Sequence, residues 1–290
     1  LRFPSGCGQK YSLPKGDIGA PQQSKRTWGV RDYDIQLTLA SKAWRQDTST
    51  YPGTSMVTGK NALGEDIVED QLWFAPFNAK GFVGDRMTVN WLYHPYLDVR
   101  ARRYRLRILN SDVARFMRLA MVVKRDGNQG EFLGEDPAVS YELVSFHMIA
   151  NDGNIMEHAV PHDGTMDLDY DGDLSDHHGV LPTLSIAERY DVVVDFGDFE
   201  PGTEIYLVNL LEHKDGRGPD REIPLAEILN GTHDSCDSAV GKFMEIRVHP
   251  FSGKDLSLNP ADYIPGRKTM IPLPALSEEE IRDAVHHTFH

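Results

Sequence analysis

The sequence predicts an all-β fold, a sandwich or barrel with long loops and one short helix near its C-terminal end. Short segments alternate apolar and polar residues, which is the period of a half-buried strand. Glycine, proline and asparagine separate these segments at short intervals, as is typical of β-sandwiches and barrels. A helical pattern is found at 276–287, where Ser277 can cap a helix and three following glutamates complement its dipole.

Composition limits the function classes. The 290 residues suffice for one large domain or two small ones with a real core. A net charge of −14 argues against a nucleic-acid partner, because phosphate binding requires clustered Lys and Arg. No segment approaches the roughly 18 apolar residues of a membrane-spanning helix, so we expect no membrane partner. The first residue is Leu1 rather than Met, and we interpret the chain as a piece of a longer protein.

Cysteine usage is sparse. Cys7 and Cys236 lie far apart and form no CxxC pair, which argues against zinc-finger and thioredoxin chemistry. A single disulfide between them and two unrelated free thiols both remain open.

The elements follow in chain order. Residues 1–30 are rich in Gly and Pro and poor in apolar side chains, so we expect an arm or linker. Residues 33–39 alternate apolar and polar side chains and predict a strand. Residues 45–70 are polar and rich in turn residues, which favours a long surface loop. Short strands parted by Gly and Pro are then expected at 71–74, 85–90 and 96–100.

The clearest strand pattern lies at 103–110. Tyr104, Leu106 and Ile108 fall on one face, and three arginines fall on the other. Segment 115–123 follows at the spacing of a hairpin. Further strands are expected at 141–149, 181–186, 190–196, 204–210 and 242–248.

Four passages resemble the second domain of three-domain multicopper oxidases, the family of laccases, spore-coat laccases, bilirubin oxidases and phenoxazinone synthases. The passages are Asp85–Asn90 with Pro95–Arg100, Arg103–Asn110 with Ala114–Phe116, Phe146–Gly153, and Ala187–Phe196. Their order and spacing together are more specific than any one of them. The resemblance implies a cupredoxin-like Greek-key sandwich or barrel.

The resemblance also implies a domain plan. Residues 1–30 would be an N-terminal arm or linker, 31–250 the cupredoxin-like second domain, and 251–290 a linker toward a missing third domain. By the same analogy the protein would be exported, to the periplasm or the cell exterior.

Copper ligands of this family come from H-x-H and H-C-H motifs in the first and third domains. The sequence contains neither motif, so we expect copper in the parent protein but not in this chain, with no catalytic and no cofactor-binding residue here. His286, His287 and His290 cluster near the chain end, where a solvated helix terminus is favoured over a metal site. Glu157, His158 and His162 flank Pro161, which favours a surface loop.

One metal signal stands out. Asp167, Asp169 and Asp171 would supply the carboxylates at positions 1, 3 and 5 of a D-x-D-x-D-G calcium loop, Gly172 would allow the sharp turn, and Asp173 would add its backbone carbonyl. Position 12 is His178 instead of the bidentate glutamate, and no helix pattern flanks the loop, so an EF-hand is excluded. A stand-alone calcium loop is predicted, and an acidic solvated loop is the alternative. The ion would order the loop before the strand expected at Leu181.

The charged passages indicate structure rather than catalysis. Glu188 and Arg189, together with the arginine stripe of 103–107, are expected to tie a strand edge through bidentate ion pairs.

The resemblance supports one main function and two alternatives. The parent would oxidise a phenol, a bilirubin-like pigment or a metal ion and reduce dioxygen to water. This domain would separate the copper-bearing domains, its partners, and wall one side of the pocket for the small-molecule or metal-ion substrate. The alternatives are a copper-less cupredoxin scaffold or interaction protein and, resting on the acidic loop alone, a calcium-binding adhesion-type module.

Overall fold

The computed structural model describes most of the chain between residues 33 and 272, together with three positions beyond that range. The described residues are 33–42, 44–45, 56–60, 66–69, 71–72, 81–84, 86–125, 140–272, 277, 279 and 282; between 44 and 72 the description covers the backbone alone. The N-terminal arm with Cys7, much of the 45–70 loop and the histidines at 286–290 lie outside the described residues. Of the helix predicted at 276–287, Glu279 and Arg282 are described and helical, and most of the rest lies outside.

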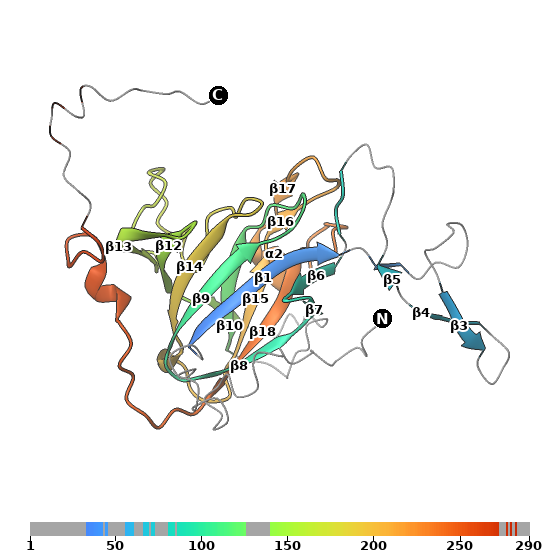
Figure 1. Ribbon diagram of the computed structural model, residues 1–290, viewed down its shortest axis with the longest axis horizontal. Helices are drawn as coiled ribbons and strands as arrows, with labels where there is room; N and C mark the ends of the chain where they lie inside the picture. Colours follow the sequence, from blue (N-terminus) through green and yellow to red (C-terminus); the bar gives the residue numbers. More distant parts are fainter. Residues whose placement is uncertain are drawn as a thin grey trace.

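Two β-sheets pack face to face and form a sandwich (Figure 1). The seven-stranded sheet has the order β13-β12-β14-β9-β1-β6-β7. The five-stranded sheet has the order β11-β10-β15-β18-β8. The predicted fold class, an all-β cupredoxin-like sandwich, is confirmed, and the chain crosses repeatedly between the sheets as a Greek-key sandwich requires.

The strand bounds are as follows. The seven-stranded sheet contains β1 (Asp34–Lys42), β6 (Arg86–Val89), β7 (Leu92–Tyr93), β9 (Arg103–Asn110), β12 (Phe146–Asn151), β13 (Asn154–His162) and β14 (Arg189–Asp195). The five-stranded sheet contains β8 (Tyr96–Arg100), β10 (Leu119–Lys124), β11 (Tyr141–Leu143), β15 (Glu204–Asn209) and β18 (Gly241–His249). Smaller elements are β2 (Trp44–Arg45), β3 (Met56–Lys60), β4 (Asp66–Glu69), β5 (Gln71–Leu72), β16 (Leu211–Glu212), β17 (Arg221–Glu222) and α2 (Leu225–Leu229).

The core lies between the two sheets and follows the predicted alternation. In β9, Tyr104, Leu106 and Ile108 are buried, whereas the arginines between them are partly exposed. From the opposite sheet, Leu207 and Met244 join the same cluster. Each buried aliphatic side chain contributes about 1.5–3 kcal/mol relative to an exposed one, so this alternation orients β9 in the sheet.

The hairpin spacing of 103–110 and 115–123 was misleading. The two strands belong to different sheets: β9 pairs with β1 and β14, and β10 pairs with β11 and β15. A buried side chain stabilises the segment that crosses from the sheet of β9 to the sheet of β10. The side-chain amide Nδ2 of Asn110 donates to the carbonyl oxygens of Arg115 at 2.8 Å and Leu184 at 3.0 Å, which ties the end of β9 to the segment that follows.

Two local expectations were wrong. The stretch 181–186 forms no strand and contributes a bridge between Leu184 and Met117. The segment around Pro161, expected as a surface loop, is the strand β13, in which His162 is buried. β13 lies at the edge of its sheet, where a proline removes no ladder hydrogen bond from a second neighbour.

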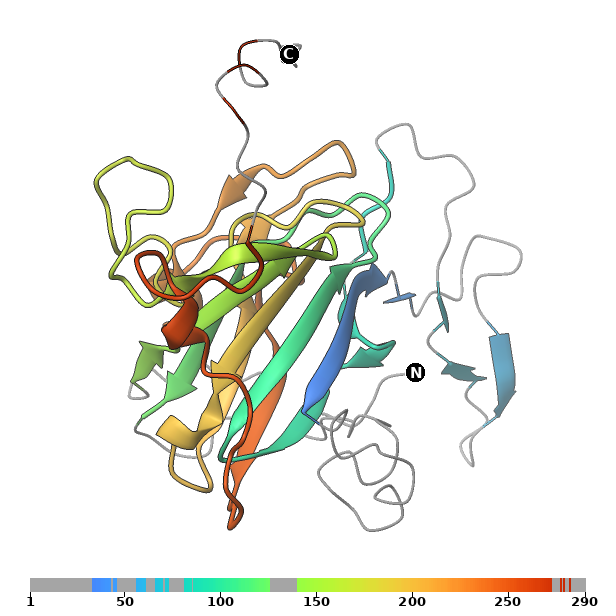
Figure 2. The same cartoon turned by 60° about the vertical axis from the view of Figure 1, so that its left-hand side comes forward.

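The segment after β18 returns along the outer face of the seven-stranded sheet, as the orange-to-red trace in Figure 2 shows. Asp255 accepts hydrogen bonds from the Arg102 side chain at 2.8 Å and from the Arg103 amide at 2.9 Å. Farther on, the amide of Met270 donates to the carbonyl of Glu157 in β13 at 2.7 Å. None of the helices in the described part of the chain combines the length and the apolar character needed to traverse a lipid bilayer.

Candidate functional site

The acidic loop spans residues 163–179 between the end of β13 and the segment that leads to β14. Its ends are held together, because the amide of Gly179 donates to the carbonyl of His162 at 3.0 Å. Gly172 has a φ of +94°, a backbone conformation that glycine adopts without strain and that the predicted sharp turn requires. The loop therefore leaves the sandwich and returns to it at nearly the same place.

The three carboxylates predicted to bind calcium lie close together. Carboxylate oxygens of Asp167, Asp169 and Asp171 lie within 4.8 Å of one another. Asp167 also accepts hydrogen bonds from the amides of Tyr170 at 2.7 Å and Gly172 at 2.9 Å, which closes the turn. A calcium ion on this group stays a prediction.

Asp173 is predicted to offer its backbone carbonyl rather than its carboxylate, and that role stays a prediction. Its carboxylate accepts hydrogen bonds from the amide and the hydroxyl of Ser175, at 2.7 and 2.6 Å, and these bonds hold the pKa of Asp173 below its ordinary value. The imidazole at position 12 of the pattern, His178, also points elsewhere, because its Nε2 lies 3.2 Å from the Ser145 hydroxyl.

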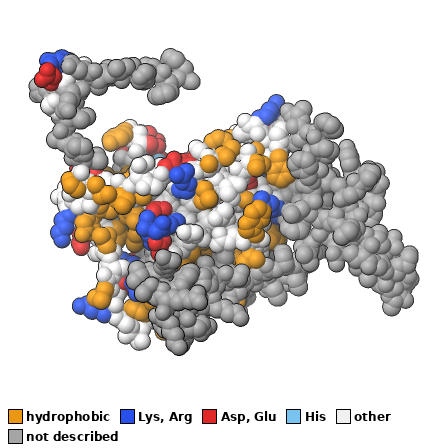
Figure 3. Space-filling view, viewed as in Figure 1, with side chains coloured by type: hydrophobic (Ala, Val, Ile, Leu, Met, Phe, Trp, Pro, Cys, Tyr) orange, Lys and Arg blue, Asp and Glu red, His pale blue; other side chains and the backbone are white. Residues whose placement is uncertain are grey.

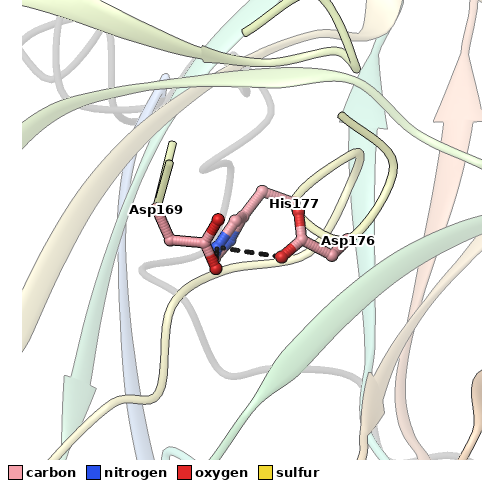
Figure 4. Close-up of side chains that lie close together, drawn as sticks. All are labelled: Asp169, Asp176 and His177. Carbon is pink, nitrogen blue, oxygen red and sulfur yellow. Dashed lines mark ion pairs between the residues drawn. The ribbon is translucent and has the colours of Figure 1, made fainter. Parts of the chain in front are cut away.

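A second group in the same loop shares Asp169. Ligand atoms of Asp169, Asp176 and His177 lie within 4.8 Å of one another. The His177 Nε2 lies 3.7 Å from an oxygen of Asp169 and 3.6 Å from an oxygen of Asp176 (Figure 4). Sequence reasoning missed His177 as a site residue. A histidine that directly follows an aspartate at the end of an acidic loop was the available signal.

His162 contacts the backbone at the C-terminal end of the loop, next to this group. Its Nδ1 lies 3.2 Å from the carbonyl oxygen of His177 and 3.0 Å from that of Val180, so Nδ1 is the donor. Burial against the stacked ring of Phe146, at a centroid distance of 4.9 Å, lowers the pKa of His162 to about 4. The ring is therefore neutral, and it fixes the backbone where the loop rejoins the sandwich.

The arginine stripe forms the ion pairs that were expected, although at a different place in the sheet. The Arg107 guanidinium donates to both oxygens of Asp34, at 2.7 and 2.5 Å, and Arg105 pairs with Asp191. These pairs join β9 to β1 and to β14. Because β9 lies between those strands, the stripe ties the middle of the sheet and not an edge.

Glu188 and Arg189 act locally. Glu188 accepts a hydrogen bond from the amide of Ser185 at 2.7 Å, and Arg189 pairs with Asp152 at 3.3 Å. Both contacts shape the turn into β14, which agrees with the structural role predicted for this passage.

A buried ion pair was not foreseen. Arg115 is fully buried and donates to both oxygens of Asp237, at 2.6 and 3.1 Å, and to the carbonyl of Gly84 at 2.9 Å. Asp237 also accepts from the amide of His213 at 2.8 Å. The pair ties the crossover after β9 to the segment before β18, over a separation of 122 residues.

An apolar cleft of about 720 Å³ lies between the seven-stranded sheet and the segment that runs along it. Exposed side chains of Ile155, Leu256, Leu258 and Ile271 line it, and Figure 3 shows hydrophobic side chains gathered on the side that carries β13. Cys236 is an exposed free thiol, remote from the acidic groups in sequence.

Comparisons with known proteins show which proteins this chain is similar to. No protein-family model matches the sequence. The chain is 28% identical over 216 residues to bilirubin oxidase of Albifimbria verrucaria, a match that covers 69% of this chain and 32% of that protein. It is 24% identical over 206 residues to a laccase of Bacillus subtilis strain 168, covering 69% of this chain and 31% of that one. The chain is thus similar in sequence to multicopper oxidases. The family resemblance predicted from the sequence is thereby confirmed.

A third curated relative agrees with this placement. "Multicopper oxidase LPR1 homolog 1" of Oryza sativa subsp. japonica is 27% identical over 188 residues, covering 63% of this chain and 23% of that protein. Among solved structures, the McoA multicopper oxidase of Aquifex aeolicus has a TM-score of 0.48 and 22% identity, covering 84% of this chain and 36% of that one. The chain spans about a third, or less, of the length of the curated proteins it matches.

Proposed function

We propose that this chain is the middle domain of a larger multicopper oxidase, and that it separates the copper-bearing domains and walls one side of their substrate pocket. The extent of the sequence match carries this proposal. About two-thirds of the chain aligns with about a third of bilirubin oxidase and of laccase, which is the share that one domain of three would occupy. The parent would couple one-electron oxidation of a phenolic, pigment or metal-ion substrate to reduction of dioxygen to water, in the periplasm or outside the cell.

The donor sets in the described part of the chain do not fit a copper centre. A blue copper site needs a cysteine thiolate with two imidazoles, and a trinuclear cluster needs several histidines. In the part of the chain that the structure describes, the groups of three or more metal-ligating side chains are the two acidic groups of the 163–179 loop. Neither contains a cysteine or a second histidine. We therefore derive no redox step from these residues and assign the chain a structural role.

The apolar cleft supports a role between domains. Leu256 is 80% exposed, and three other apolar side chains of the cleft are more than two-fifths exposed. Contiguous apolar surface of this kind marks a site that another protein surface covers. Interfaces between domains of one chain have this partly apolar character, so we infer that a neighbouring domain of the parent packs over the cleft.

An ion in the acidic loop would have a structural task in this scheme. It would order the loop before β14 and would take no part in oxidation, because the two acidic groups of the loop offer hard oxygen ligands and a single imidazole, that of His177.

Oxygen uptake tests the proposed function. The full-length protein that contains this chain is loaded with copper and mixed with a phenolic substrate in an oxygen electrode. We expect oxygen consumption that disappears when copper is removed, and none from residues 1–290 alone. A copper-loaded full-length protein that consumes no oxygen with phenolic, pigment or metal-ion substrates would favour the copper-less cupredoxin scaffold instead.

A further inference from the structure

We propose that Asp169, Asp176 and His177 form a binding site for one divalent first-row transition-metal ion of the zinc class. The proposal rests on this chain's own loop and does not depend on the proposed oxidase function. It differs from the calcium loop predicted from the sequence, because it uses a nitrogen ligand and shares with that loop the carboxylate of Asp169 alone.

The imidazole of His177 is the observation that points to a ligand. Its side chain is 9% exposed, and its Nδ1 is buried without a hydrogen-bond partner. Its Nε2 faces the two carboxylates at 3.7 and 3.6 Å, which is too long for a hydrogen bond. One oxygen of Asp176, Oδ1, is also buried without a partner. An imidazole that is nine-tenths buried and whose Nε2 faces two carboxylates beyond hydrogen-bond distance requires an explanation, and an ion between Nε2 and those carboxylates is one.

The spacing of these atoms suits a tetrahedral metal ion. Zinc binds imidazole nitrogen and carboxylate oxygen at about 2.0–2.2 Å, so two ligand atoms on one ion lie about 3.4 Å apart. The distances of 3.6 and 3.7 Å are within a few tenths of an ångström of that value. Two aspartates and a neutral imidazole also balance a divalent charge. Asp169 is 46% exposed, which leaves an open side for entry of the ion and for a water ligand.

The sandwich holds two of the three ligands in place. The carbonyl of His177 accepts from His162 in β13 at 3.2 Å. The carbonyl of Asp176 accepts from the Arg118 guanidinium at 3.3 Å, just before β10. The backbone of both ligands is thus anchored to strands of both sheets. Supporting bonds of this kind fix ligand orientation before the ion arrives.

The chemistry of the ligands favours a zinc-class ion over calcium. Calcium takes six to eight oxygen ligands and has little affinity for nitrogen. In the oxygen group, Asp167 already uses both carboxylate oxygens as acceptors of backbone amides, and Asp171 accepts from the amide of Asp173. Imidazole with carboxylates suits zinc and its neighbours in the first transition row. Binding would link Asp169, in the middle of the loop, to its anchored end and so pin the loop to the sandwich.

Zinc titration by calorimetry tests the site. The full 290-residue chain is stripped with chelator and titrated with Zn²⁺ in a background in which His286, His287 and His290 are replaced by alanine. That background removes the competing imidazoles near the chain end. We expect one zinc ion per chain, and at least about tenfold weaker binding in both Asp169→Asn and His177→Ala. Asp169→Asn is the variant that guards against misfolding, since its side chain is half exposed.

Asp171→Asn is the matched control. It makes the same charge change in the same exposed loop, but it belongs to the oxygen group alone, so zinc affinity should stay within about threefold. Replacing zinc by Co²⁺ should give a visible absorption band that His177→Ala shifts or abolishes. The proposal is overturned if no stoichiometric zinc binds, if Asp171→Asn weakens binding as much as Asp169→Asn, or if Ca²⁺ binds more tightly than Zn²⁺.

Discussion

Replacing Asp237 by alanine should destabilise the protein more than removal of any exposed ion-pair partner. Asp237 is nearly fully buried and pairs through both oxygens with the fully buried guanidinium of Arg115. It also accepts from the amides of His213 and Ala239, at 2.8 and 3.0 Å. The variant leaves a buried positive charge with the carbonyl of Gly84 as a remaining acceptor. Breaking such a pair costs about 3–5 kcal/mol of unfolding free energy.

Urea unfolding measures this loss through the midpoint and the slope of the transition. Glu142→Ala is the control, because Glu142 is 61% exposed and its pair with Arg125 should contribute no more than about 1 kcal/mol. The double variant Arg115→Met with Asp237→Ala removes the stranded charge and should be more stable than Asp237→Ala alone. A loss for Asp237→Ala as small as that of the control, or a double variant with fully additive losses, would refute this reasoning.

Three further predictions concern the core, the acid response and the cleft. Leu106→Ala should lower the unfolding free energy by about 2–5 kcal/mol, measured by urea unfolding, because Leu106 lies at the centre of the core; a loss under about 1 kcal/mol would contradict its placement. Burial lowers the pKa of His162 from 6.5 to about 4, so the folded ring stays neutral where the unfolded chain protonates it. The unfolding free energy should then fall as the pH drops from about 6.5 toward 4, by up to about 3 kcal/mol, and His162→Gln should flatten this dependence. An unchanged pH profile in that variant would argue against the assignment. Leu256→Ser should lower the thermal midpoint of the full-length protein and leave that of residues 1–290 unchanged, since the exposed Leu256 would be covered only by a neighbouring domain. Equal midpoint shifts in the two proteins would show that no domain covers the cleft.

Local patterns predicted the parts of the fold in which one face of a strand is buried. In β9, the alternation of Tyr104, Leu106 and Ile108 with arginines predicts both the strand and its buried face. The same reasoning failed for β13. Its first half is partly exposed, and Pro161 indicates an interruption of any regular element. A proline in an edge strand costs no pairing with a second neighbour, and the sequence does not show which strands lie at the edge.

Long-range pairing was beyond the reach of sequence patterns. Arg115 and Asp237 are 122 residues apart, and nothing in either neighbourhood indicates that they meet. For the acidic loop, the aspartate spacing predicted a cluster, and Asp167, Asp169 and Asp171 do come together. The orientation of His177 depends on the backbone anchors that His162 and Arg118 provide, so its place beside Asp169 follows from the tertiary fold rather than from spacing.

We propose that this chain is the copper-free middle domain of a copper-bearing oxidase. Metal analysis by mass spectrometry, on the full-length protein and on residues 1–290 purified in parallel, tests it most directly. We predict a complete multicopper complement in the full-length protein and no copper in residues 1–290. A full-length protein without copper would contradict the oxidase assignment, and stoichiometric copper in residues 1–290 would contradict the placement of the ligands in other domains.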